Sequence, residues 1–141
     1  QRQTNFVCHE LAHFWSSGAV ATGPENWINE GFAEFVSGRA VRALRGDSAY
    51  AAMETQWRAR AARAGAVWTA SATARPDANT SYGKAPLLLA ALEQRIGTMM
   101  MDRLLQQFMT RPLRTTRAVL ALVAELAGQD VADWFERQLI A

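Results

Sequence analysis

Residues 9–13 read H-E-L-A-H, and residues 27–35 read W-I-N-E-G-F-A-E-F. The first stretch lies in a predicted helix, where residues four apart lie one above the other on one face. Its two histidines can therefore direct ring nitrogens at a single Zn²⁺ ion, with bonds of about 2.0–2.1 Å. Glu10 lies too far round the helix to be a good third ligand. It is placed instead to take a proton from the water that a metal activates.

A catalytic zinc ion takes three protein ligands and keeps one coordination position open. Glu30 is the candidate for the third ligand, because a short loop allows its predicted helix to fold back beside the first. Glu34 is one turn further along the same face. By geometry, it can accept the outer N–H of a ligating histidine and fix the orientation of that ring. The alternative interpretation is a buried, hydrogen-bonded histidine pair that binds no metal.

The rest of the chain predicts further helices and no strand. No run of residues alternates between apolar and polar, and the good helix formers alanine, leucine, arginine, glutamine and methionine are abundant. Residues 66–81 are predicted to be an irregular loop, with a turn at residues 75–77. Glycine, proline, threonine and aspartate mark the ends of seven expected helices. These helices cover approximately residues 3–17, 24–46, 47–63, 83–96, 98–110, 115–127 and 130–139.

Length and composition exclude several classes of protein. With 141 residues, the chain is long enough for one domain with its own core. A net charge of +2 argues against a nucleic-acid-coating protein, and 50% hydrophobic residues exclude a disordered tail. The single cysteine, Cys8, excludes an intrachain disulfide and an all-cysteine zinc site. The longest apolar stretches, residues 85–92 and 118–124, are shorter than the roughly 18 residues of a membrane span.

Taken together, the two opening stretches resemble the gluzincin zinc metallopeptidases of clan MA, especially the aminopeptidase-N-like family. In that family, the two histidines and the later glutamate bind zinc, and the glutamate inside H-E-x-x-H is the general base. The resemblance implies one Zn²⁺ ion bound by His9, His13 and Glu30, with Glu10 as the general base.

Two later stretches extend this resemblance over nearly the whole chain. Residues 81–86, S-Y-G-K-A-P, are similar to the Tyr-x-Lys-Gly stretch of the family, with alanine where the family often has glycine. The family's tyrosine stabilises the oxyanion, which implies that role for Tyr82. A half-buried core tyrosine is the alternative for this residue. Residues 128–135 resemble the start of the family's terminal helix.

The sequence also departs from the family pattern. Sixteen residues separate His13 from Glu30, whereas typical aminopeptidase-N-like members have eighteen. The family's upstream Gly-Ala-Met-Glu-Asn segment, which holds the free amine of the substrate, has no counterpart here. We therefore expect residues 1–141 to be the helical zinc-binding, C-terminal part of a thermolysin-like zincin catalytic domain. The upstream part of the same parent chain is then its partner.

The expected function is zinc-dependent hydrolysis of peptide bonds in peptides or proteins, with an aminopeptidase-like specificity implied by the resemblance. The alternative is a non-catalytic helical module in which zinc joins two helices as a scaffold or interaction surface. A structural zinc site usually has four protein ligands and needs no general base, so the role of Glu10 distinguishes the two.

Overall fold

The computed structural model describes residues 2–16, 18–111 and 113–141, and every regular element within them is a helix. The predicted all-α class with about seven helices is confirmed. Seven α-helices and one π-helical turn, η1, follow one another along these residues. Their bounds are α1 (Arg2–Ala12), α2 (Asn26–Arg45), α3 (Asp47–Ala61), η1 (Thr80–Lys84), α4 (Ala85–Ile96), α5 (Thr98–Gln107), α6 (Thr116–Ala127) and α7 (Gln129–Ile140).

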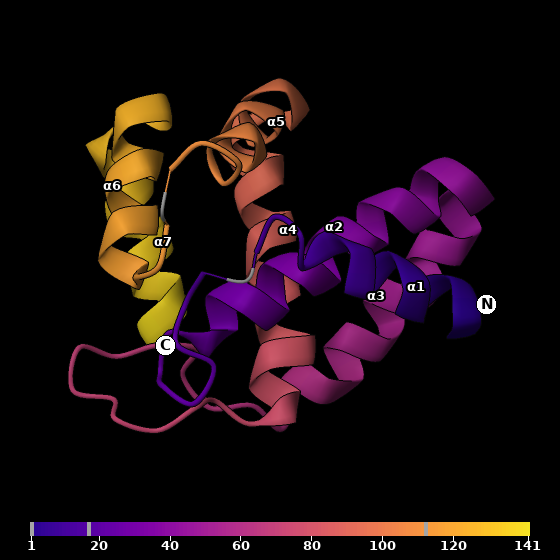
Figure 1. Ribbon diagram of the computed structural model, residues 1–141, viewed down its shortest axis with the longest axis horizontal. Helices are drawn as coiled ribbons and strands as arrows, with labels where there is room; N and C mark the ends of the chain where they lie inside the picture. The colour runs from indigo at the N-terminus through magenta and orange to yellow at the C-terminus, as the bar shows by residue number, and fades with distance from the viewer. Residues whose placement is uncertain (1, 17, 112) are drawn as a thin grey trace.

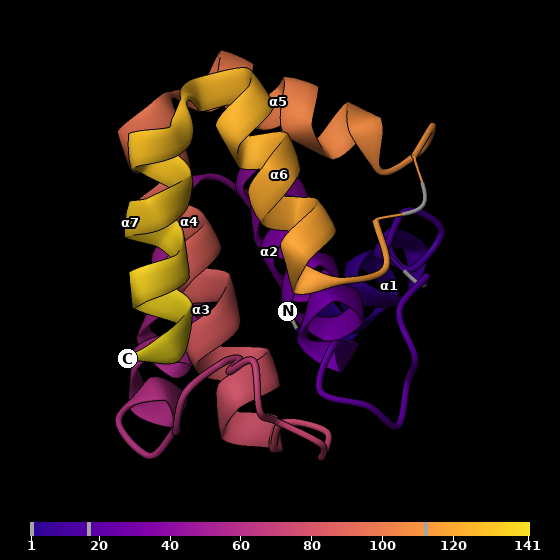
Figure 2. The same cartoon turned by 90° about the vertical axis from the view of Figure 1, so that its left-hand side faces the viewer.

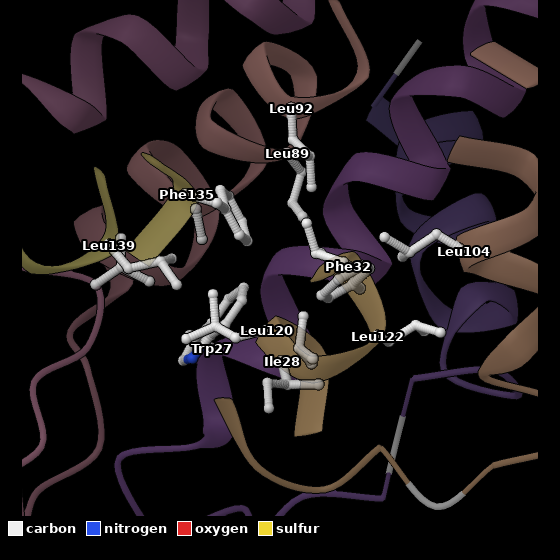
Figure 3. Packing of buried hydrophobic residues seen from close by; sticks show 14 of the residues in the cluster. Trp27, Ile28, Phe32, Leu89, Leu92, Leu104, Leu120, Leu122, Phe135 and Leu139 are labelled. Atoms are coloured by element: carbon white, nitrogen blue, oxygen red, sulfur yellow. The ribbon is translucent and has the colours of Figure 1, made fainter. Parts of the chain in front are cut away.

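Helix α2 is the central element of the fold, and it contacts α1, α3, η1 and α4. Figure 1 shows α1, α2 and α3 close together near the N-terminus, with α6 and α7 as a pair at the opposite end. Three of the α2 side chains, Trp27, Ile28 and Phe32, are buried and lie in the middle of the main core (Figure 3). The core is completed from α4, α5, α6 and α7 by Leu89, Leu92, Leu104, Leu120, Leu122, Phe135 and Leu139.

Helix α1 is packed on one side only. Of its residues, His9 and Ala12 are buried against the rest of the chain. Phe6 and Leu11 are exposed, as is Phe14 in the turn that follows. A second, smaller core cluster lies between α2 and α3 and consists of Val41, Met53 and Trp57, with Cys8 of α1 packed against it. The first helix is therefore a peripheral element, whereas α2 is a core element.

Single glycines join three pairs of consecutive helices. Gly46 lies between α2 and α3, Gly97 between α4 and α5, and Gly128 between α6 and α7, with φ values of +84°, +84° and +101°. Positive φ is unfavourable for residues with a Cβ atom, so glycine allows the chain to reverse in one residue. The prediction that helices stop at these glycines agrees with the structure.

Helix α1 ends at Ala12, five residues before the predicted end. The chain continues in tighter turns, because His13 N and Phe14 N donate to the carbonyls of Glu10 and Leu11 three residues back. His13 thus lies just beyond the helix but follows directly from its last turn. The predicted end at Ser17 lies outside the described residues. Helix α5 ends at Gln107, three residues before the predicted end at Thr110.

The stretch around Tyr82 is helical, although it was predicted to be mostly loop. Asp77 Oδ1 accepts a hydrogen bond from Thr80 N at 2.7 Å, which caps the start of this segment. η1 then runs directly into α4. Gly83 lies against α3 so closely that a Cβ atom would overlap Cβ of Arg60. This close approach places the tyrosine next to α3 and α2.

The loop between α3 and η1 is attached to the end of the chain. The backbone N–H groups of Val67 and Trp68 both donate to the Leu139 carbonyl, and Lys84 Nζ donates to the Ala141 carbonyl. Figure 2 shows this loop beneath the C-terminal end of α7. Within the described residues, no helix has the length and apolar character needed to cross a membrane.

Candidate metal centre

Three side chains from α1, the turn after it and α2 form a compact cluster. The candidate ligand atoms of His9, His13 and Glu30 all lie within 4.8 Å of one another. Glu30 Oε2 is 3.4 Å from His9 Nε2 and 3.6 Å from His13 Nε2. The same nitrogen of each imidazole therefore faces one carboxylate oxygen.

The turn after α1 is attached to α2 beside this cluster. Ser16 Oγ donates to the Asn29 carbonyl at 3.0 Å, and the Asn29 amide exchanges two 3.0 Å hydrogen bonds with the backbone of Ala19. His13 Nδ1 lies 3.5 Å from the Ser16 carbonyl oxygen. Because Asn29 precedes Glu30, these contacts hold the turn that carries His13 next to the carboxylate.

A second carboxylate lies on the outer side of His9. Glu34 Oε2 is 2.9 Å from His9 Nδ1, and the other oxygen of Glu34, Oε1, accepts a 2.8 Å hydrogen bond from Trp57 Nε1 on α3. An imidazole that donates through Nδ1 has its lone pair on Nε2. His9 is thus oriented with the nitrogen that faces Glu30 available for a metal ion.

Tyr82 and Arg75 reach Glu30 from the other side of the cluster. Tyr82 Oη donates to Glu30 Oε2 at 2.8 Å, and the tyrosine ring lies 5.7 Å from the His9 ring. An Arg75 terminal nitrogen, Nη2, is 3.5 Å from Glu30 Oε1. The Asn26 amide oxygen faces Arg75 and accepts from its Nε at 3.0 Å. The two oxygens of Glu30 therefore have different partners.

Glu10 lies at an open cleft beside the cluster. The cleft has a volume of about 300 Å³ and is lined by Asn5, Phe6, His9, Glu10, Glu34 and Tyr82. Glu10 itself is exposed, whereas His9 is buried. The carboxylate and the Tyr82 side chain therefore share one solvent-accessible space next to a candidate ligand.

The charges of the cluster shift the pKa values of its members. Burial lowers the pKa of His9, but the hydrogen bonds and charges of Glu30 and Glu34 outweigh burial and raise this pKa to about 9. The hydrogen bond with His9 lowers the pKa of Glu30 to about 2, despite the opposing effect of burial. Burial, reinforced by the Glu30 hydrogen bond, raises the pKa of Tyr82 to about 12. In the absence of metal, the protonated form of His9 is therefore favoured next to the Glu30 carboxylate.

We expect the metal-free protein to lose stability between pH 6.5 and 9. The raised pKa of His9 stabilises the fold fully below its ordinary 6.5, and this contribution is lost as pH rises through about 9. The lowered pKa of Glu30 stabilises the fold above 4.5, and this contribution is lost as pH falls towards 2. Between pH 6.5 and 9, the free energy of unfolding should fall by an amount on the order of 2 kcal/mol, which lowers Tm by about 5–10 °C.

Thermal unfolding of chelator-treated protein at several pH values measures this effect. A His9→Gln variant is the control, because removal of the titrating ring should flatten the decline above pH 6.5. A Tm that stays constant from pH 6.5 to 9 in the unsubstituted protein would contradict the prediction.

The donor set of the cluster fits a zinc ion. Two imidazole nitrogens and one carboxylate oxygen are typical ligands of catalytic zinc, and an outer carboxylate on a ligating histidine is a common accompaniment. The fit is strengthened by His9, which presents Nε2 inwards and is held through Nδ1. A metal ion can be shared by three or more histidine, cysteine or carboxylate side chains that lie close together. Among the described residues, His9, His13 and Glu30 form such a group.

All the site residues predicted from the sequence lie in one region: His9, Glu10, His13, Glu30, Glu34 and Tyr82. Trp57 and Arg75, which contact the two carboxylates, were not predicted. Arg75 was interpreted only as part of a turn, and Trp57 is one apolar residue of an alanine- and arginine-rich helix. No local pattern distinguishes either residue.

Two histidines four residues apart, one in a helix and one in the turn that continues it, lie beside a carboxylate from the next helix and define the H-E-x-x-H class of metalloproteins. The sequence matches the Peptidase family M1 domain over residues 1–136. The chain therefore belongs to peptidase family M1, a family of zinc metallopeptidases, in agreement with the predicted resemblance to aminopeptidase-N-like gluzincins.

Solved structures have the same fold. The M1 zinc metallopeptidase of Deinococcus radiodurans matches with a TM-score of 0.77 and 22% identity over 96% of this chain. A mutant of that enzyme bound to a Tyr-Ser-Ala substrate matches with a TM-score of 0.78 and 23% identity over 97% of this chain. The chain spans about a third of the length of these structures, 32% and 33% respectively. No curated protein gives a significant match.

Proposed function

We propose that this chain is the helical zinc-binding part of the catalytic domain of a longer metallopeptidase, which hydrolyses peptide bonds in peptides or proteins. One Zn²⁺ ion is held by His9, His13 and Glu30. The observation that carries the proposal is the convergence of their ligand atoms to within 4.8 Å, together with the open cleft beside them. Membership of the M1 family supports the same reaction class.

Glu10 is the general base of the proposed reaction. Its exposed carboxylate, in the cleft next to His9, accepts the proton of the attacking water and delivers it to the leaving amine. The water oxygen first bonds to the carbonyl carbon, and the electron pair of the C=O bond moves to the carbonyl oxygen. The C=O bond then re-forms, and the C–N bond breaks as the amine takes the proton from Glu10. A bound zinc ion polarises the scissile carbonyl and acidifies the attacking water.

Tyr82 donates a hydrogen bond to the oxygen of the scissile carbonyl as negative charge develops on it. Its raised pKa of about 12 keeps the hydroxyl protonated across the physiological pH range. The hydroxyl already donates to an anionic oxygen, Oε2 of Glu30, in the present arrangement. Tyr82 is therefore a suitable donor for an oxyanion next to the metal ligands.

Tyr82→Phe should lower kcat by about 10²–10³-fold, with a smaller change in KM, because the donor acts mainly on the transition state. Zinc content should be unchanged, since the three proposed ligands remain. Steady-state kinetics of the full-length protein, with zinc measured by atomic spectroscopy, test this. Equal kcat values for the variant and the unsubstituted protein would remove Tyr82 from the mechanism.

An aminopeptidase-like specificity completes the proposal. It is supported by the resemblance of the zinc stretches to the aminopeptidase-N-like family, and the solved M1 relative was crystallised with a short peptide, Tyr-Ser-Ala. The free amine of the substrate is then held by the upstream part of the parent chain. Aminoacyl and internally cleaved peptides, compared as substrates of the full-length protein, distinguish aminopeptidase from endopeptidase activity.

A hydroxamate inhibitor tests whether the zinc site is catalytic. Such a ligand needs an open coordination position, which a site with three protein ligands leaves free. At 100 times its Kd, the inhibitor should stabilise the zinc-loaded protein by about 2.7 kcal/mol, which raises Tm by roughly 5–10 °C. Stoichiometric zinc without any shift in Tm would instead support the zinc-stabilised scaffold.

A further inference from the structure

The two carboxylates of the metal centre are each held by an outer donor. Glu34 uses Oε2 for His9 and Oε1 for Trp57, and Glu30 uses Oε2 for the histidines and Oε1 for Arg75. Arg75 is exposed, whereas Trp57 is 1% exposed. The buried donor has the more defined position and the shorter contact.

The Trp57 indole is fixed by close packing on α3 and α2. Tyr50 contacts its ring edge-on, with the ring centroids 5.8 Å apart. Gly38 of α2 lies so near that a Cβ atom would be 2.5 Å from Trp57 Cη2. Any larger residue at position 38 would force the indole to move. The ring therefore has one orientation, and its N–H points at Glu34.

The chemistry of the Trp57 indole, the Glu34 carboxylate and the His9 imidazole fixes which group donates and which accepts. An indole N–H can only donate, so it must pair with an acceptor when buried. Its bond to a carboxylate is charge-assisted and shorter than a typical neutral one. With Oε1 engaged by Trp57, Glu34 presents Oε2 to His9 Nδ1. Trp57 thereby sets which nitrogen of His9 faces Glu30 and His13.

We propose that Trp57 is a positioning residue of the metal centre, acting on zinc through Glu34 and His9. The proposal rests on the proposed function of the cluster as a zinc site. Trp57 touches neither the candidate ligand atoms nor the cleft, so its effect on the metal passes through Glu34. A purely structural role of Trp57 would consist of its packing alone, with Met53 and Val41 as well as with Tyr50 and Gly38.

Trp57→Phe separates the two roles, because phenylalanine keeps an aromatic ring and removes the N–H donor. We expect the Kd for Zn²⁺, measured by competition with a chromophoric chelator, to rise about 10-fold. This is the lower end of the 10–100-fold effect typical of groups that orient metal ligands. Trp68→Phe is the matched control, because Trp68 Nε1 donates to a different carboxylate, Glu25 Oε1, at 3.1 Å. The Kd of the Trp68→Phe protein for Zn²⁺ should equal that of the unsubstituted protein.

A double-mutant cycle shows whether the effect passes through Glu34. In a Glu34→Ala background, the additional Trp57→Phe substitution should change the Kd for Zn²⁺ less than 2-fold. A full 10-fold loss in that background would mean that Trp57 acts through packing, and the proposal would be overturned. An unchanged Kd in Trp57→Phe alone would overturn it equally.

The NMR resonances of the indole N–H groups of the five tryptophans can be followed in the unsubstituted protein. They test the proposal even if a variant fails to fold. Addition of Zn²⁺ should shift the Trp57 signal and leave the Trp68 signal in place. If Zn²⁺ binds and the Trp57 signal does not move, the positioning role is wrong although the metal site is correct. If Zn²⁺ does not bind at all, the proposed function itself fails.

Discussion

Replacement of Glu10 by glutamine should leave zinc bound and lower peptide hydrolysis by about 10²–10⁴-fold, which is the usual contribution of a general base. Glutamine has nearly the size of glutamate but cannot accept the proton of the attacking water. The carboxylate is exposed at the cleft and is not one of the three clustered ligand residues. The substitution should therefore affect the chemical step and spare the metal site.

Three measurements on the full-length Glu10→Gln protein decide this prediction. Zinc content per chain should equal that of the unsubstituted protein, and the hydroxamate should still raise Tm. Turnover of a peptide substrate should be nearly lost. Normal turnover with normal zinc content would show that another group takes the proton, and loss of zinc would show that Glu10 supports the metal instead.

Replacement of Glu30 by alanine should abolish stoichiometric zinc binding. Glu30 Oε2 is the atom that both histidines face, so the substitution removes one ligand of three. The loss of affinity for Zn²⁺ should exceed the 10–100-fold effect of removing a group that only hydrogen-bonds to a metal ligand. Tyr82 would also lose its acceptor, Oε2 of Glu30, and Arg75 would lose its partner, Oε1. The Kd for Zn²⁺ and the zinc content after dialysis measure the effect.

Glu125→Ala is a suitable control for this experiment. Its carboxylate forms an ion pair with Arg111 far from the cluster in the chain, and such solvent-exposed pairs contribute little to stability. Zinc content and Tm should both stay close to those of the unsubstituted protein. Retention of zinc in the Glu30→Ala protein would mean that Glu30 is not a ligand.

Helical periodicity explains why the core of the site could be located from the sequence. The four-residue spacing of His9 and His13 and the later Glu30 and Glu34 are local features, and a short turn can bring the two helices together. The detail that His13 lies in a turn, beyond Ala12, was not predictable from propensity. That ending depends on Ser16 bonding to the Asn29 carbonyl on the next helix.

Tertiary packing explains what the sequence did not reveal. The loop predicted over residues 66–81, with its turn at residues 75–77, was expected to reach as far as the residue before Tyr82. The helical turn there depends on Asp77 as a cap and on the close approach of Gly83 to α3. Trp57 is 23 residues from Glu34 along the chain, so their hydrogen bond exists only once α3 has packed against α2.

The unequal packing of α1 and α2 divides the metal centre between two parts of the fold. Glu30 and Glu34 belong to a helix that also carries Trp27 and Phe32 into the main core, so their positions persist as long as the fold does. His9 and His13 come from the peripheral helix and the turn after it. A metal ion would cross-link the two parts. Loss of the metal should therefore increase local unfolding of α1 and leave α2 folded. Amide hydrogen exchange in α1 would then report metal occupancy directly.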